Sequence, residues 1–76
     1  MRTGYAIRDE HQYGWLQTRT RVEGVECPVT VYVEEEEHAM TFHRLKDAKA
    51  MLKAVRRDHR RPDRVNIVNA RGRVVA

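Results

Sequence analysis

The residues able to hold a metal ion or act as a nucleophile are one cysteine and four histidines: Cys27, His11, His38, His43 and His59. A zinc site needs such ligands at short spacings, as in C-x-x-C or in two histidines one helical turn apart. The chain has neither spacing, although Glu35 and His38 would share a helical turn if that segment were helical. We therefore predict no metal site and interpret the histidines as scattered surface residues.

Cys27 next to a histidine could in principle form a nucleophilic pair. It precedes Pro28 near the start of a predicted strand, where a small buried thiol is the commoner finding, so we expect it to be buried. The phosphate-binding patterns GxxxxGK and GxGxxG do not occur in the sequence. We predict that the protein is not an enzyme and uses no cofactor.

The strongest signal is a stripe of basic side chains that starts in the amphipathic stretch 42–57. Six of them fall within an arc of roughly 100° when residues are placed on a helix, and two more extend the stripe past its end. We predict that these residues bind a partner: Lys46, Lys49, Lys53, Arg56, Arg57, Arg60, Arg61 and Arg64. Such a stripe can neutralise phosphates or dock on an acidic protein surface. The alternative is a solvated helix face.

Charge is divided unequally along the chain, which carries +4 overall. Residues 1–42 hold four Lys/Arg against eight Asp/Glu, giving −4, and residues 43–76 hold eleven against three, giving +8. Like charges gathered on one side repel each other, and a complementary partner removes that cost. The acidic run Glu34–Glu37 would repel a phosphate backbone if it lay near the basic stripe.

The stretch 42–57 also predicts the single helix of the domain. Apolar residues recur at steps of three and four, which places them on one side: Leu45, Ala48, Met51, Leu52 and Val55. His43 or Arg44 stands where a capping side chain is preferred, and Asp47 compensates in part through the helix dipole. Pro62 prevents the helix from continuing beyond about residue 60.

Short segments rich in β-branched and aromatic residues predict strands on both sides of this helix. We expect strands over residues 3–8, 13–22, 29–33, 65–69 and 73–76, with turns at residues 9–12, 23–24 and 70–72. The first three strands are close enough in sequence to form a meander. The acidic run is predicted to be a solvated connection, and Phe42 is predicted to close one end of the core.

These elements predict an α+β fold of the order β-β-β-α-β-β. A single antiparallel sheet of four to five short strands has the amphipathic helix packed on one face, in one domain over residues 1–76. The chain has 76 residues, 41% of them apolar and 34% charged, which suits a small folded domain. No apolar run is long enough to span a bilayer, and the first residues do not form a secretory signal. With a lone cysteine, these features favour the cytoplasm.

Several segments together resemble a layout found among small proteins of phages and prophages. They are GYAIRDEHQYGWL near the start, an acidic link into A-x-x-F, the helix LKDAKAMLKAV and the strand VNIV. Proteins of that kind often bind and modulate a host protein, and anti-CRISPR proteins are the best-known group. The resemblance implies a similar role here, and it identifies no individual inhibitor.

Three functions remain open at this point. The leading hypothesis is a small non-enzymatic binding module, of phage or prophage type, that attaches to a host protein or nucleoprotein complex. The second is a nucleic-acid-binding accessory protein that uses the basic helix directly. The third is a self-associating protein whose acidic end meets the basic end of a neighbour. Aromatic residues that could stack on bases are few and are better explained as core, which favours the first hypothesis.

Overall fold

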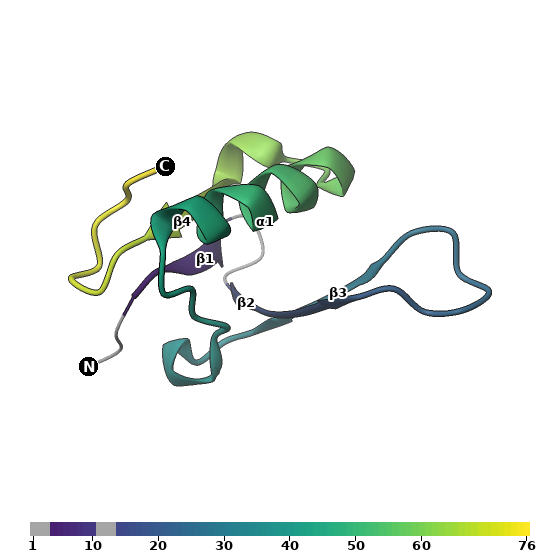
Figure 1. Ribbon diagram of the computed structural model, residues 1–76, viewed down its shortest axis with the longest axis horizontal. Helices are drawn as coiled ribbons and strands as arrows, with labels where there is room; N and C mark the ends of the chain where they lie inside the picture. The colour runs from purple at the N-terminus through teal and green to yellow at the C-terminus, as the bar shows by residue number, and fades with distance from the viewer. Residues whose placement is uncertain (1–3, 11–13) are drawn as a thin grey trace.

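In the computed structural model, which describes residues 4–10 and 14–76, a four-stranded antiparallel sheet carries an α-helix on one side (Figure 1). The elements in chain order are β1 (Ala6–Asp9), β2 (Gly14–Thr20), β3 (Val29–Val33), the 3-10 helix η1 (Glu36–His38), α1 (Leu45–Asp58), the 3-10 helix η2 (Pro62–Arg64) and β4 (Val65–Val68). The predicted α+β class, with one helix on one antiparallel sheet, is confirmed.

The strand order is β3-β2-β1-β4. The first three strands form the predicted meander, and β4 returns after the helix to pair antiparallel with β1, with Ile7 opposite Ile67. The register of β2 against β3 shifts by one residue between Leu16 and Thr18, which marks a bulge at Gln17. The β2–β3 hairpin extends beyond the rest of the sheet, and its loop projects away from the body of the molecule (Figure 1).

The helix packs on the sheet through the predicted stripe. Ala48, Leu52 and Val55 are buried, and Leu45 and Met51 are half-buried at the edges of the same cluster. The cluster is completed by apolar residues of the strands: Ile7, Leu16, Val65 and Ile67. Arg44 is the N-cap residue and makes no capping hydrogen bond through its side chain. N-terminal capping therefore contributes little to the helix, and burial of its apolar side is what holds it in place.

Phe42 lies outside the helix and beside β1. Its backbone exchanges two hydrogen bonds with Tyr5, and its ring packs against the core as predicted. Gly4 has a φ of +79°, and a Cβ at that position would collide with the carbonyl of Phe42. Glycine is therefore required where the segment that leads into the helix crosses the start of β1.

The predicted last strand at residues 73–76 is not a regular strand. The segment runs beside β4 with one isolated bridge, Val68 to Val74, and it exchanges backbone hydrogen bonds with Ile67. Asn69 is not the end of a strand either: its Oδ1 accepts the backbone N–H groups of Arg71 and Arg73 and shapes the turn. These side-chain bonds end the β4 ladder at Val68, which is why the regular sheet has four strands.

Three local expectations were wrong. Asp9 is the last residue of β1 and fully buried, whereas it was assigned to a turn. Glu10 is in a turn as predicted, while residues 11–12 of that turn, and Thr3 and Tyr13 at the predicted strand starts, lie outside the described residues. Cys27 is exposed, because it lies in the projecting hairpin loop and not against the core. Residues 21–22 belong to that loop and not to β2.

Candidate partner-binding surface

Most of the predicted partner-binding residues are exposed. Those on α1 are Lys46, Lys49, Lys53 and Arg57; Arg60 and Arg61 follow in the link to η2, and Arg64 ends η2. We call these seven residues the basic surface. Arg61 and Arg64 lie 3.7 and 3.9 Å from Asp63 in loose ion pairs, which solvent exposure makes weak. Within the described residues, no ion pair or side-chain hydrogen bond engages the other five.

Arg56 does not belong to the exposed set. Its side chain is half-buried, and its Nε and Nη2 donate to the carbonyl of Val65 at 3.2 and 2.8 Å. The expectation that the whole stripe lies on the solvent side was therefore wrong for Arg56. Its position on the helix is the closest of the stripe to the apolar face, so its guanidinium reaches the start of β4 and not the solvent.

Two further contacts fix the C-terminal end of α1 on the sheet. His59, directly after the helix, donates from Nε2 to Oδ2 of Asp9 at 2.6 Å, and the backbone N–H of Glu10 donates to the carbonyl of Arg64 at 2.9 Å. Together with Arg56, these contacts join the end of the helix and η2 to the ends of β1 and β4. The arginines around this end therefore project from a backbone that these contacts hold against the sheet.

His59 is not one of the scattered surface histidines that we predicted. Its side chain is 7% exposed and that of Asp9 is 0% exposed. Nδ1 of His59 accepts the backbone N–H of Arg61 at 2.8 Å, so the neutral ring carries its proton on Nε2, where it donates to the carboxylate. Both ring nitrogens are engaged within the fold. His59 therefore has no nitrogen left to act as a general base.

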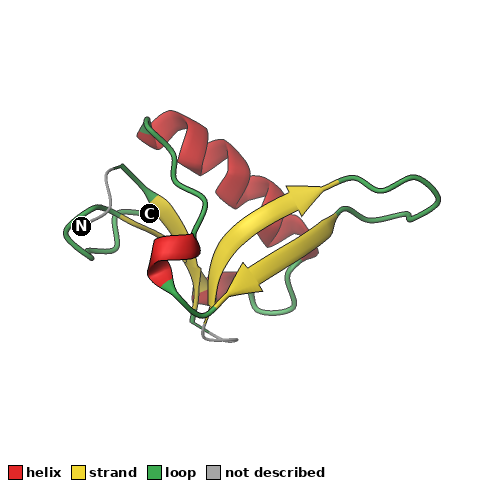
Figure 2. Ribbon diagram, turned by 90° about the horizontal axis from the view of Figure 1, so that it is seen from below, coloured by secondary structure: helices red, strands yellow, loops and turns green. Residues whose placement is uncertain are grey.

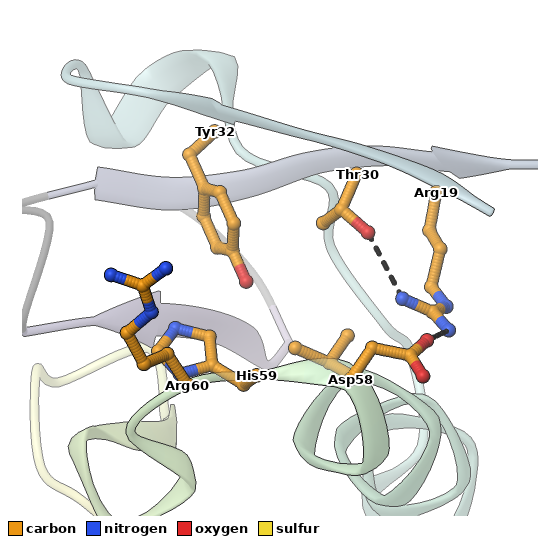
Figure 3. A pocket seen from close by; sticks show the side chains of 7 residues that line it. Arg19, Thr30, Tyr32, Asp58, His59 and Arg60 are labelled. Atoms are coloured by element: carbon orange, nitrogen blue, oxygen red, sulfur yellow. Dashed lines mark hydrogen bonds and ion pairs between the residues drawn. The ribbon is translucent and has the colours of Figure 1, made fainter. Parts of the chain in front are cut away.

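A hollow of about 440 Å³ opens between the β2–β3 hairpin and the end of α1 (Figure 3). It is lined by Arg19, Thr30, Tyr32, Val55, Asp58, His59 and Arg60. The hydroxyl of Tyr32 points from β3 toward the helix, and Arg60 lies at the rim (Figure 3). The hollow thus adjoins the basic surface through Arg60.

The bulge in β2 brings Arg19 into this hollow. Leu16 pairs with Tyr32 and Arg19 with Thr30, so the extra residue between them places Leu16 and Arg19 on the same side of the sheet. Arg19 donates to Oγ1 of Thr30 at 2.9 Å and forms an ion pair with Asp58 at 2.5 Å. Its charge is used to join the hairpin to the helix.

The pKa of Tyr32 is raised to about 12, chiefly by burial and also by the nearby Asp9 carboxylate, while the Arg19 guanidinium acts in the opposite direction. Gly14 makes this position available to Tyr32, because a Cβ at residue 14 would lie 3.0 Å from the Cβ of Tyr32. The tyrosine therefore remains a neutral hydrogen-bond donor well above neutral pH.

The acidic run lies on the other side of the sheet from α1. Figure 1 shows η1 below the sheet and the helix above it, and in Figure 2 η1 stands in front of the strands with α1 behind them. All four residues Glu34–Glu37 are exposed. Oε2 of Glu35 lies 3.8 Å from Nδ1 of His38, since the segment forms the short helix η1 and the two residues share its turn. The acidic run is therefore separated from the basic surface by the sheet.

Within residues 4–10 and 14–76, no cluster of three or more His, Cys, Asp or Glu side chains is arranged to hold a metal ion. In the same residues, no helix combines the length and apolar character needed to cross a membrane. Comparisons of the chain with protein-family models, with curated proteins and with solved structures find no match.

Proposed function

We propose that the protein is a small non-enzymatic binding module that attaches to a host protein or nucleoprotein complex through the basic surface and modulates it. The observation that carries the proposal is the gathering of seven exposed cations at α1, the following link and η2, with the acidic run on the opposite side of the sheet. Such a layout costs repulsion in the free protein, which an anionic partner surface removes.

The fixed geometry of the surface supports the same function. Arg57, Arg60 and Arg64 surround the end of α1 that Arg56 and His59 join to the sheet. Because these backbone positions are held before binding, less ordering cost is paid when a partner docks. The engagement of both nitrogens of His59 supports a role without catalysis.

The resemblance to small phage and prophage proteins supports one concrete form of this function, an inhibitor of the anti-CRISPR kind that acts in the cytoplasm. A second candidate function is direct binding of nucleic acid. It is favoured by the position of Glu34–Glu37, which is on the far side of the sheet and does not repel a phosphate backbone at the basic surface. The two candidates share the surface and differ in the ligand.

A matched pair of charge reversals tests the surface. One variant changes Lys49, Lys53 and Arg57 to Glu; Arg56 is kept because it bonds to β4. The control changes Arg21, Arg71 and Arg73 to Glu, which are exposed, belong neither to α1 nor to the basic surface and give the same change in net charge. We expect the first variant to lose capture of a protein partner from host lysate, with and without nuclease, and the control to keep it. Equal capture by both variants contradicts the proposal.

Salt dependence separates the two candidates. Binding through about six phosphates should weaken by roughly 10³ or more between about 50 and 200 mM salt, whereas a protein interface built on a few desolvated anchors should weaken far less. We expect shallow salt dependence toward the captured protein and only weak binding to free DNA or RNA oligonucleotides. Tight oligonucleotide binding at physiological salt, with no protein captured, establishes the second candidate instead.

A further inference from the structure

β3 is an edge of the sheet without the usual protection. Residues Val29–Val33 contain no charge and no proline, and the bulge of the hairpin lies in β2 and not in β3. Within the described residues, no backbone group of β3 bonds to anything other than its neighbour β2. Edge strands of soluble proteins are normally protected by charged residues, proline or a covering segment, because their free N–H and C=O groups pair readily with another strand.

The other edge of the same sheet is covered. The N–H of Ile67 donates to the carbonyl of Ala76, and the N–H of Val75 donates to the carbonyl of Ile67, both at 2.9 Å. The segment after β4 thus occupies the outer groups of that strand. The contrast leaves β3 as the edge that is open to a further strand.

The side chains of β3 add an apolar surface to the open edge. Val29 and Val31 are 42% and 40% exposed, and they point away from the helix because Thr30 and Tyr32 line the hollow beneath it. Exposed valines in a strand are typical of a surface that packs beside a second strand, since β-branched cross-strand pairs stabilise a sheet.

The sequence of β3 matches a second copy of itself. Read in either direction, Val29–Val33 is a valine, a polar or aromatic residue, a central valine, a polar or aromatic residue and a valine. Antiparallel pairing about a two-fold axis at Val31 sets Val29 opposite Val33 of the second copy and Thr30 opposite Tyr32 of the second copy. Both pairs join residues that favour sheets, and the two copies present identical surfaces, as a two-fold interface requires.

Neighbouring registers are less favourable. A shift by two residues in one direction places Thr30 opposite Glu34 of the second copy, and a shift in the other direction places Glu26 opposite Glu34. The first sets a charge beside the strand, and the second sets two like charges opposite each other, which is destabilising. Either shift also pairs only three residues of β3 with β3 of the second copy, whereas the register centred on Val31 pairs all five. Its own like-charged pair, Glu26 opposite Glu36, lies three residues beyond each end of the strand.

We propose that β3 pairs antiparallel with β3 of a second copy, forming a continuous eight-stranded sheet across a two-fold axis at Val31. The two helices then lie on the same side of this sheet, because a two-fold axis perpendicular to it keeps each face on its own side. The basic surfaces of both copies consequently face the same direction. This pairing is independent of the proposed ligand of the basic surface.

Sedimentation equilibrium over a dilution series tests the association. The protein should approach the mass of a dimer as its concentration rises, and Val31→Lys should remain a monomer at every concentration. At concentrations where the wild type is also monomeric, the two proteins should melt alike, because association stabilises only the dimer. The control Val74→Lys changes another exposed valine, which lies beside β4, and should dimerise like the wild type. A wild-type protein that stays monomeric throughout, or a Val31→Lys protein that still dimerises, overturns the proposal.

Cross-linking tests the register. In a Cys27→Ser background, which removes the exposed natural thiol, Val31→Cys should form a disulfide-linked dimer under mild oxidation, because two opposed residues on paired strands lie within disulfide range. Val29→Cys should not, because its counterpart then lies opposite residue 33. Equal cross-linking of the two variants, or none by Val31→Cys, contradicts a two-fold axis at Val31.

Discussion

His59 and Asp9 form the contact that sequence patterns alone did not reveal. The two residues are 50 positions apart, and each was assigned to the surface or to a turn. One signal in the sequence pointed to Asp9: it follows Ile7 at the two-residue step of a strand, so it shares the buried face of Ile7. A buried carboxylate needs a donor, and His59 supplies one from the end of the helix.

Tyr32 carries a prediction about alkaline stability. Its pKa is raised from 10.0 to about 12 in the folded protein, so the native state retains the proton at a pH where the unfolded chain has released it. The contribution of this hydroxyl is fully present below pH 10 and is lost as the pH rises toward 12. We expect Tyr32→Phe, which cannot ionise, to lose less stability than the wild type over that range, as measured by urea unfolding.

Other groups also titrate at alkaline pH, so the comparison between the two proteins carries the test. Their difference in unfolding free energy should be constant below pH 10 and should then move in favour of Tyr32→Phe. A constant difference up to pH 12 would show that Tyr32 ionises alike in the folded and unfolded chains.

At the scale of elements, the bulge in β2 decides which side chains enter the hollow. Strict alternation would put Leu16 and Arg19 on opposite faces, but one extra residue at Gln17 puts both on the face that carries α1. Arg19 can then reach Thr30 and Asp58. A single inserted residue thus connects the hairpin to the helix.

The helix provides the sharpest test of the core. Leu52 is 4% exposed at the centre of the buried stripe, so Leu52→Asp places an unpaired charge among apolar side chains. We expect a loss of roughly 4 kcal/mol or more, enough to unfold so small a domain. Thermal unfolding followed by circular dichroism measures it. The control is Lys53→Asp at the neighbouring exposed residue, which should melt within a few degrees of the wild type. A cooperative melt of Leu52→Asp close to that of the wild type would contradict the packing of α1.

At the scale of the whole molecule, the sheet separates two charged sides and the hairpin extends from one end. The chain spans 38 × 24 × 21 Å, and this length arises from the projecting β2–β3 hairpin. Beyond Trp15, β2 no longer pairs with β1, so few contacts hold the distal hairpin to the body. The contact of Arg19 with Asp58 is the main polar link between the hairpin and α1.

This link predicts where the molecule opens first. Arg19→Met keeps the aliphatic part of the side chain and removes the ion pair, so we expect faster hydrogen exchange of the amides of residues 18–31 with little change in α1. The loss of stability should be about 1 kcal/mol, because Asp58 is partly exposed. Arg21→Met, an exposed arginine two residues further along, is the matched control. Identical exchange in both variants would show that the ion pair does not hold the hairpin.

Local pattern in the sequence was sufficient for the class of fold. The three- and four-residue steps of Leu45, Ala48 and Leu52 specify a helix and its buried side, and two-residue alternation specifies the strand at Val29–Val33, because both periods follow from backbone geometry within one element. The charge of each half of the chain and the exposed part of the basic stripe follow from the same patterns. Apolar content and length were enough to indicate one small domain.

The tertiary structure alone decided how the elements meet. Register and the chain path between distant segments decide which residues meet. They set the pairing of His59 with Asp9 and the bond of Arg56 to Val65. They also set the side of the sheet on which Glu34–Glu37 lie and the edge that stays open. A bulge of one residue reverses the direction of every side chain after it, and no local propensity specifies where it falls. For that reason the helix was predictable from its own residues, whereas the hollow and the contacts of Arg19 were not.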